Sequence, residues 1–259
     1  MAAKTAVITG ASSGIGAAIA RKLGAGGWNV VLAARREKEL EAVAADSGER
    51  ALAVVMDVTR KADMEKLLED AVEAFGRVDV WINNAGRGIG KKILDVTEDE
   101  FDEILAVNLK SVFYGMQVAV PHFQKRGEGH LINVSSFLGR VPFVTSRSVY
   151  NAAKAAVNIL TTNLRMDLRR TDPGIHVSLV MPGTVKTDFA KNALGGTPSM
   201  PISGRSPMVP QTPEEVADLV WDLIQNPKPE LYTNPASPGL AARYYRDVGV
   251  FEDEMFGGQ

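Results

Sequence analysis

Tyr150 and Lys154 are the residues whose types and spacing most directly indicate chemistry. They stand four positions apart at the start of a segment with helical periodicity, so the predicted helix presents both side chains on one face, one turn apart. A phenol with its ordinary pKa of about 10 is a poor acid or base at neutral pH, and a nearby ammonium group lowers that pKa because it favours the phenolate. The pair can provide the general acid and base of an alcohol–carbonyl interconversion. A Tyr and a Lys at this spacing are also a common packed pair on a helix.

A glycine-rich turn near the N-terminus is the second stretch with chemical meaning. Residues 6–9 form a short, apolar, β-branched run that predicts a buried parallel strand. Gly10, Gly14 and Gly16 follow at once, and apolar residues then recur at helical spacing. Glycine permits a tight turn and close backbone approach, and the free N–H groups at a helix start attract phosphate. Because the spacing differs from the usual Gly-x-Gly-x-x-Gly fingerprint, the turn alone fits either a phosphate site or a simple chain reversal.

The elements that must position these residues alternate along the chain. This pattern predicts a doubly wound α/β fold of the Rossmann type: a single domain over residues 1–259, with a parallel sheet between two helical layers. The expected strands are 6–9, 29–34, 52–56, 78–82, 130–134, 175–181 and a short 231–233. The expected helices are one after the glycine turn, 36–45, one capped by Thr59 and stopped by Gly76, 97–125 with a Thr97–Glu100 capping box, 150–170, and one that begins at Thr212.

One segment does not follow the alternation. Residues 195–210 contain four prolines and three glycines and show no periodicity. A loop this long in a compact domain is usually a lid or a binding loop, or is disordered. We therefore predict that residues 189–211 form a lid over the substrate and are mobile without ligand.

The composition excludes several classes of function. The net charge is −2 with acidic and basic residues mixed, so we expect no nucleic-acid partner. Cysteine is absent, and the three histidines are scattered without metal-ligand spacing, so we expect neither thiol chemistry nor a metal site. We find no secretory signal and no apolar run long enough to span a bilayer, and we therefore expect a cytoplasmic protein without a membrane span.

Several short motifs occur together in a fixed order. They are Thr9-Gly10-x3-Gly14-Ile15-Gly16, Asp57-Val58, Asn83-Asn84-Ala85-Gly86, Asn108, Ser136, Tyr150-x3-Lys154 and Pro182-Gly183-x-Val185-x-Thr187. In this order they resemble the short-chain dehydrogenase/reductase family, over roughly residues 4–190 and more weakly to about residue 234. The resemblance implies hydride transfer between a nicotinamide cofactor and a small alcohol or carbonyl substrate.

The resemblance also implies a catalytic set of four residues. Tyr150 would exchange the proton with the substrate oxygen, and Lys154 would lower the pKa of Tyr150 and hold the nicotinamide ribose. Ser136 would hydrogen-bond the substrate oxygen, and Asn108 would keep a water that links Lys154 to solvent. Read without the family, Asn108 is a polar residue inside a helix and Ser136 a turn residue after a strand.

Two adjacent serines compete for the catalytic position. The family places a glycine three residues after the catalytic serine, so Gly139 selects Ser136 over Ser135. The gap from Ser136 to Tyr150 is one residue longer than in the family pattern. This difference affects the expected shape of the loop between them and not the assignment of Ser136.

The cofactor site implied by the resemblance follows the strand ends. Asp57 would bond the adenine amino group beside the Val58 backbone, Asn83 would brace the fourth strand, and Thr187 would bond the carboxamide or the phosphates. The full predicted set is Gly10, Ser12, Ser13, Gly14, Ile15, Gly16, Arg35, Arg36, Asp57, Val58, Asn84, Ala85, Gly86, Tyr150, Lys154, Pro182, Gly183, Val185 and Thr187.

The end of the second strand predicts the choice of cofactor. An NAD enzyme of this fold commonly places an acidic residue there, which bonds the ribose 2′-hydroxyl and repels a 2′-phosphate. By the family pattern this position is Ala34, and Arg35 and Arg36 follow it. A guanidinium group can hold a phosphate through two N–H donors. We therefore predict NADP(H), with Arg35 as the main contact and Arg36 assisting, rather than NAD(H).

Other interpretations concern the substrate, the activity and the assembly. The residues expected to line the substrate pocket are Phe137, Arg140, Val144, Arg147, Thr184 and the segment 189–211, with Arg87 either joining them or exposed on a loop. The apolar lining, with proline and methionine in the lid, suggests a ketone or aldehyde with apolar bulk. The alternatives to an oxidoreductase are a non-catalytic NADP-binding regulator and a sugar-nucleotide epimerase or dehydratase. Family members often pair through the helices at 97–125 and 150–170, whose many apolar residues one sheet face would not cover, so we predict a homodimer or homotetramer.

Overall fold

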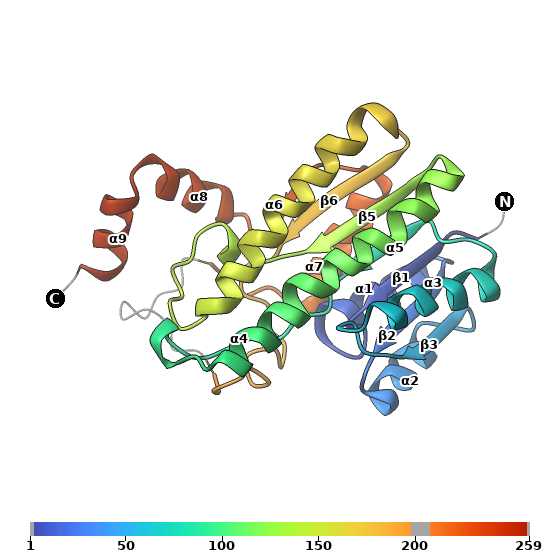
Figure 1. Cartoon of the computed structure of the whole chain (residues 1–259), viewed down its shortest axis with the longest axis horizontal. Coiled ribbons are helices and arrows are strands. Elements are labelled where there is room, and N and C mark those ends of the chain that lie inside the picture. Colours follow the sequence, from blue (N-terminus) through green and yellow to red (C-terminus); the bar gives the residue numbers. More distant parts are fainter. Residues whose placement is uncertain (1–2, 198–207, 258–259) are drawn as a thin grey trace.

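A parallel sheet between two layers of helices forms the body of the protein. The computed structural model describes residues 3–197 and 208–257 (Figure 1). The strands are β1 (Thr5–Thr9), β2 (Asn29–Ala34), β3 (Ala51–Val55), β4 (Val80–Asn83), β5 (Gly129–Val134), β6 (Ile175–Met181) and β7 (Glu230–Tyr232). They pair in parallel in the order β3-β2-β1-β4-β5-β6-β7. This confirms the predicted doubly wound, three-layer α/β fold in a single domain.

Nine α-helices and three shorter helical segments accompany the strands in the described part of the chain, and the last two α-helices follow β7. The α-helices are α1 (Gly14–Ala25), α2 (Glu37–Asp46), α3 (Lys61–Phe75), α4 (Glu98–Leu105), α5 (Ser111–Arg126), α6 (Ser148–Thr171), α7 (Pro213–Gln225), α8 (Ser237–Arg246) and α9 (Val248–Phe256). The shorter segments are 3₁₀ turns at Ile93–Asp95 and Phe137–Gly139 and a π-helical segment at Ala106–Lys110.

Successive strand residues face opposite layers of helices. On β1, Ala6 and Ile8 belong to the core formed with α1, α2 and α7, whereas Val7 belongs to the core formed with α3, α5 and α6. Because both faces of the strand are buried, its sequence is a continuous apolar run rather than an alternating one. The same arrangement recurs on β2, where Val30 and Val31 belong to opposite cores.

Two of the three predicted helix N-caps form in the structure. Thr97 with Glu100 and Thr212 with Glu215 form complete capping boxes at the starts of α4 and α7, as predicted. Thr59 does not cap α3: its hydroxyl instead donates to Asp57 Oδ1 at 2.9 Å, and Arg60 occupies the cap position without a side-chain bond. Because the Thr59 hydroxyl is bonded to the Asp57 carboxylate, it does not accept from the N–H groups at the start of α3.

The predicted helix 97–125 contains an irregularity that its periodicity does not reveal. α4 and α5 form one continuous rod, but the π-helical segment Ala106–Lys110 inserts a wider turn between them. By length and composition the run Glu98–Arg126 is the one candidate membrane span among the described residues, and 56% of its most apolar window is buried inside the fold. In this fold the run packs as a core helix.

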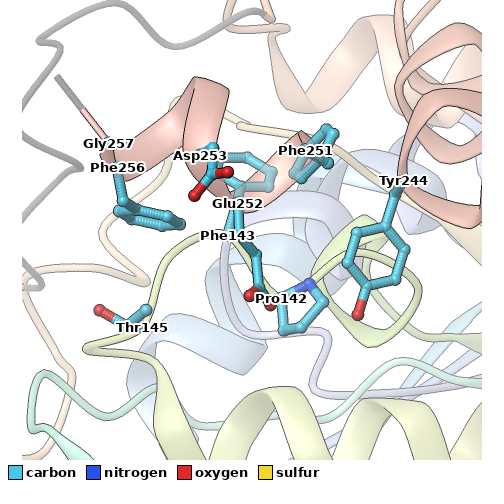
Figure 2. A pocket seen from close by; sticks show the side chains of 9 residues that line it. All are labelled: Pro142, Phe143, Thr145, Tyr244, Phe251, Glu252, Asp253, Phe256 and Gly257. Atoms are coloured by element: carbon cyan, nitrogen blue, oxygen red, sulfur yellow. The ribbon is translucent and has the colours of Figure 1, made fainter. Parts of the chain in front are cut away.

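The last two helices have no counterpart in the predictions. α8 and α9 extend from one end of the body (Figure 1), and Phe251 of α9 is buried with Phe137 and Phe143. Figure 2 shows the shallow pocket of about 440 Å³ that α9 forms with residues 142–145. The C-terminal helices thus pack on the loop that leads to α6.

Candidate active site

A cleft of about 760 Å³ runs along the carboxyl ends of the strands. Gly10 lies just after β1, Asn84 after β4, Ser136 after β5 and Pro182 after β6, and all four line the cleft. Ligands of open α/β sheets bind at this edge, where the strand order reverses between β1 and β4. Of the predicted catalytic and cofactor residues, every one lines the cleft except Gly16 and Asn108, which lie behind its wall.

The glycine turn is packed so closely that side chains are excluded. Gly10 has a φ of +68°, and a Cβ there would lie 2.7 Å from the Ala85 Cα. A Cβ at Gly16 would lie 2.5 Å from the Gly10 carbonyl oxygen. Asn84 secures this contact, because its Nδ2 donates to the carbonyl oxygens of Thr9 at 2.9 Å and Gly10 at 3.2 Å. The result is a bare backbone at the start of α1, open to the cleft.

Tyr150 and Lys154 lie in the first two turns of α6, and both are buried. Tyr150 is 7% exposed and Lys154 3%. Lys154 Nζ donates to the Val134 carbonyl oxygen at 3.0 Å and lies 5.8 Å from the centre of the Tyr150 ring. Burial lowers the pKa of Lys154 to about 8, because the charged amine loses its hydration.

The phenol of Tyr150 is subject to opposing influences. Burial raises its pKa, whereas the positive charge of Arg147 and a hydrogen bond with Ser136 act to lower it. The ring of Phe189 packs against the Tyr150 ring with 5.6 Å between centroids. The phenol thus has one polar and one charged neighbour, Ser136 and Arg147, and packs against the apolar ring of Phe189.

The two candidate serines are separated by their hydrogen bonds. Ser135 Oγ donates to Asn158 Oδ1 at 2.6 Å and so ties β5 to α6. Ser136 Oγ accepts from the Leu138 N–H at 3.1 Å and is the serine that meets the Tyr150 phenol. The structure therefore brings Ser136, and not Ser135, to Tyr150.

Gly139 allows the turn after Ser136 to touch α6. A Cβ at this position would lie 2.6 Å from the Lys154 carbonyl carbon and 2.9 Å from the Ala155 nitrogen. The close approach is between backbone and backbone, so it fixes the turn against the helix that carries Tyr150.

Asn108 sits in the π-helical segment behind the cleft. Its Nδ2 donates to the carbonyl oxygens of Arg87 at 2.9 Å and Ile104 at 3.0 Å, and its Oδ1 accepts from the Arg87 N–H at 3.1 Å. A Cβ at Gly86 would lie 3.1 Å from Asn108 Oδ1 and 3.8 Å from Lys154 Nζ. Asn108 and Lys154 are therefore neighbours with only the small Gly86 between them.

The two arginines that follow β2, Arg35 and Arg36, make different contacts. Arg36 Nη2 donates to the hydroxyls of Ser12 at 2.9 Å and Ser13 at 2.6 Å, across the mouth of the glycine turn. Arg35 and Ala34 line the same end of the cleft. The sequence interpretation gave the larger role to Arg35, but it is Arg36 that reaches the glycine turn in this structure.

The pocket residues predicted from the sequence are mostly at the cleft. Phe137, Val144, Arg147 and Thr184 line it. Arg140 does not: its Nη2 forms an ion pair with Glu230 Oε1 at 2.8 Å. Of the predicted lid, Phe189, Ala190, Asn192, Thr197 and Met208 line the cleft, and residues 198–207 lie outside the described part of the chain. The sequence interpretation missed Gly88 and the ring contact of Phe189.

The sequence was compared with those of known protein families and proteins. The sequence profile described as short chain dehydrogenase matches residues 4–196. An uncharacterized oxidoreductase of Staphylococcus aureus is 37% identical over 226 residues, which are 87% of this chain and 92% of the relative.

Two solved structures with bound nicotinamide cofactors are similar over most of their length. A short chain dehydrogenase/reductase from Burkholderia phymatum in complex with NAD is 28% identical, with a TM-score of 0.85 and coverage of 96% of this chain and 95% of that one. An alcohol dehydrogenase from the archaeon Thermococcus sibiricus complexed with 5-hydroxy-NADP is 29% identical, with a TM-score of 0.77 and coverage of 90% and 97%.

Proposed function

This chain belongs to the short-chain dehydrogenase family of oxidoreductases, and from that premise we propose that it transfers hydride reversibly between NADP(H) and a small alcohol or carbonyl substrate, with reduction favoured. The observation that carries the proposal is the meeting of Ser136 with the buried Tyr150 phenol in one wall of the cleft, opposite the bare backbone of the glycine turn.

The cleft fits a dinucleotide. Gly10 and Gly14 have φ values of +68° and +58°, and a Cβ at Gly14 would lie 3.1 Å from Thr187 Cγ2, so only glycine leaves room between these walls. The backbone of the glycine turn would hold the pyrophosphate at the α1 start. Asp57 and Val58 would hold the adenine, and Tyr150, Lys154 and Thr187 would hold the nicotinamide end.

The chemistry is divided between the bound group and the chain. The nicotinamide, when bound, supplies or accepts a hydride. In the reducing direction Tyr150 gives its phenolic proton to the substrate oxygen, and Ser136 donates a hydrogen bond that keeps this oxygen in place. Lys154 favours the phenolate that remains, and the water held at Asn108 would return a proton to it. A carbonyl thus takes up a hydride and a proton and becomes an alcohol.

Turnover of a carbonyl panel with NADPH and with NADH tests the proposal. Reduction of several ketones or aldehydes is expected. If a purified, cofactor-binding protein reduced none of them and oxidised no alcohol, the regulator alternative would replace the oxidoreductase. Interconversion of sugar nucleotides without net use of cofactor would favour the epimerase alternative.

Cofactor preference gives a quantitative prediction. We expect the wild type to prefer NADP(H) in kcat/KM, because each charged hydrogen bond to the 2′-phosphate contributes about 1.5–3 kcal/mol, or about 10- to 100-fold. Ala34→Asp combined with Arg35→Ala should move the preference toward NAD(H), because the new carboxylate bonds a 2′-hydroxyl and repels a phosphate.

The two arginines can be separated in the same assay. Arg36→Ala alone should weaken NADP(H) if its bridge to Ser12 and Ser13 marks the phosphate position. Arg21→Ala is the matched control, since Arg21 pairs with Asp46 on the surface. A wild type that prefers NAD(H), or a double variant whose preference does not move, would refute the assignment.

The exposed faces of α4, α5 and α6 support an oligomer. Several apolar residues that suggested an uncovered surface, among them Val112 and Val157, are buried within the monomer. Phe101, Phe113 and Ile159 remain 43%, 42% and 62% exposed. We propose that these faces pair two copies of the chain.

Light scattering at micromolar concentration tests this assembly. The wild type should show at least a dimer mass, and the combination of Phe113→Glu with Ile159→Glu should yield a monomer, because a charge cannot be buried unpaired at an apolar contact. A monomeric wild type would contradict the proposal.

A further inference from the structure

Arg147 stands out among the cleft residues because its partly buried guanidinium has no ionic partner, and its Nη1 no hydrogen-bond partner, in the described part of the chain. The residue immediately precedes α6, and its guanidinium carbon lies 5.5 Å from the centre of the Tyr150 ring and 5.1 Å from that of Phe189. Its Nη1 is buried without a hydrogen-bond partner. Within residues 3–197 and 208–257 no carboxylate forms an ion pair with it.

Among the other arginines near the cleft, Arg35 is exposed to solvent, and the rest are paired or bonded. Arg87 pairs with Glu103, Arg140 pairs with Glu230, and Arg36 bonds two serine hydroxyls. Burial lowers the pKa of Arg147, yet a guanidinium stays protonated at physiological pH.

Arg147 is only partly exposed, and a cation that is partly withdrawn from water without an ionic partner costs stability. Such a cost is tolerated where a site is prepared for a ligand of opposite charge. Arg147 lines the cleft, so it is open to a ligand from that side.

The surroundings of Arg147 are shaped to hold it beside the catalytic wall. Gly88 leaves the space that Nη1 occupies, since a Cβ there would collide with it. The guanidinium lies within cation–π range of both the Tyr150 and the Phe189 ring. This places the planar guanidinium, with its N–H donors, next to the Tyr150 ring at the cleft.

We propose that Arg147 is a subsite for the carboxylate of the substrate, and that the preferred substrates are short oxo acids and the corresponding hydroxy acids. A carboxylate accepts two parallel hydrogen bonds from a guanidinium, and this contact would orient the carbonyl carbon toward Tyr150 and Ser136. The inference rests on the proposed oxidoreductase function and narrows its substrate class from carbonyl compounds in general to anionic ones.

The test must separate binding of the carboxylate from an effect on the phenol. The charge of Arg147 also favours the phenolate of Tyr150, so removing it will change turnover of every substrate. The ratio of kcat/KM for an oxo acid to that for its methyl ester cancels this common effect. Five-carbon acids with the oxo group at carbon 2, 3 or 4 vary the spacing at constant size.

Three variants are compared with the wild type in this assay. Arg147→Met keeps the length and the aromatic packing without the charge, Arg147→Lys keeps the charge without the planar fork, and Arg169→Gln is a matched control at the exposed end of α6. For at least one spacing the wild type should prefer the acid, and Arg147→Met should lower the acid-to-ester ratio by about 10- to 100-fold. Arg147→Lys should be intermediate, and Arg169→Gln should match the wild type.

Direct binding of the same acids to the protein with NADP⁺, measured by calorimetry, gives a readout that needs no turnover. Arg147→Met should weaken this binding by a similar factor, and its melting temperature should equal or exceed that of the wild type because a partly buried charge without an ionic partner is removed.

The possible results separate the two proposals. If neutral carbonyls are reduced but the acid-to-ester ratio and the affinity do not depend on Arg147, the subsite is wrong and the oxidoreductase function stands. If acids bind through Arg147 but nothing is turned over, the subsite stands and the function is wrong. A wild type that binds none of the acids overturns the subsite.

Discussion

Replacing Tyr150 with Phe is expected to lower turnover by at least about 100-fold, the usual scale of help from a general acid. Phe keeps the ring that packs on Phe189 and Arg147 but lacks the hydroxyl that meets Ser136. The fold and the affinity for the cofactor should therefore change little. Steady-state kinetics, together with titration of cofactor fluorescence, separate the two quantities.

The control for this variant is Tyr114→Phe. Tyr114 lies on α5 beside Lys110, away from the cleft, so its loss of a hydroxyl should leave turnover unchanged. If Tyr150→Phe retained near-normal turnover, another group would be the proton donor.

The pH dependence of the wild type follows from the same assignment. Reduction needs the protonated phenol and should decline as pH rises through the pKa of Tyr150, whereas oxidation needs the phenolate and should increase. Arg147 and Ser136 oppose the effect of burial on this pKa, so removing either group should move both profiles to higher pH.

Gly139→Ala is expected to reduce both stability and activity. The added methyl group would lie 2.6 Å from the Lys154 carbonyl carbon, which belongs to helix backbone and cannot turn aside. Overpacking of this kind costs about 1–3 kcal/mol and should lower the melting temperature by several degrees. Because the strain falls between the turn that carries Ser136 and the helix that carries Tyr150, turnover should fall as well.

Gly239→Ala is the matched control for this substitution. Gly239 is an exposed residue of α8, and a Cβ there would meet nothing within 4 Å. Alanine is the better helix former, so this variant should melt at or slightly above the wild-type temperature. Equal melting temperatures and equal turnover for Gly139→Ala and the wild type would mean that the turn can move away from α6 at no cost.

The parts of the fold that the sequence predicts are those encoded by neighbouring residues. The capping boxes at Thr97 and Thr212 depend on a glutamate three positions later, and both form. Asn108, in the π-helical segment, instead bonds the backbone of Arg87, 21 residues away. No periodicity within the helix can reveal such a partner.

The candidate site shows the same limit. Motif order identifies which residues gather at the cleft, but not where long side chains point. Arg140 and Arg147 look equivalent in the sequence, yet Arg140 pairs with Glu230, 90 positions away in the chain, whereas Arg147 lines the cleft. The burial of Phe251 likewise depends on Phe137, which is remote in sequence, so the C-terminal helices were not anticipated.

The strand order β3-β2-β1-β4-β5-β6-β7 has a consequence for the chain during its synthesis. The first three strands are complete once residue 55 has left the ribosome, and β1 then forms an outer border of this partial sheet. An unpaired border of this kind is a template for joining other chains, and it stays open until Val80–Asn83 emerges and pairs with it. β1, which lies at the centre of the finished sheet, is thus the part of the nascent chain most in need of shielding. Substitutions that slow the emergence or docking of β4 should therefore lower the yield of folded protein even where they leave its final stability intact.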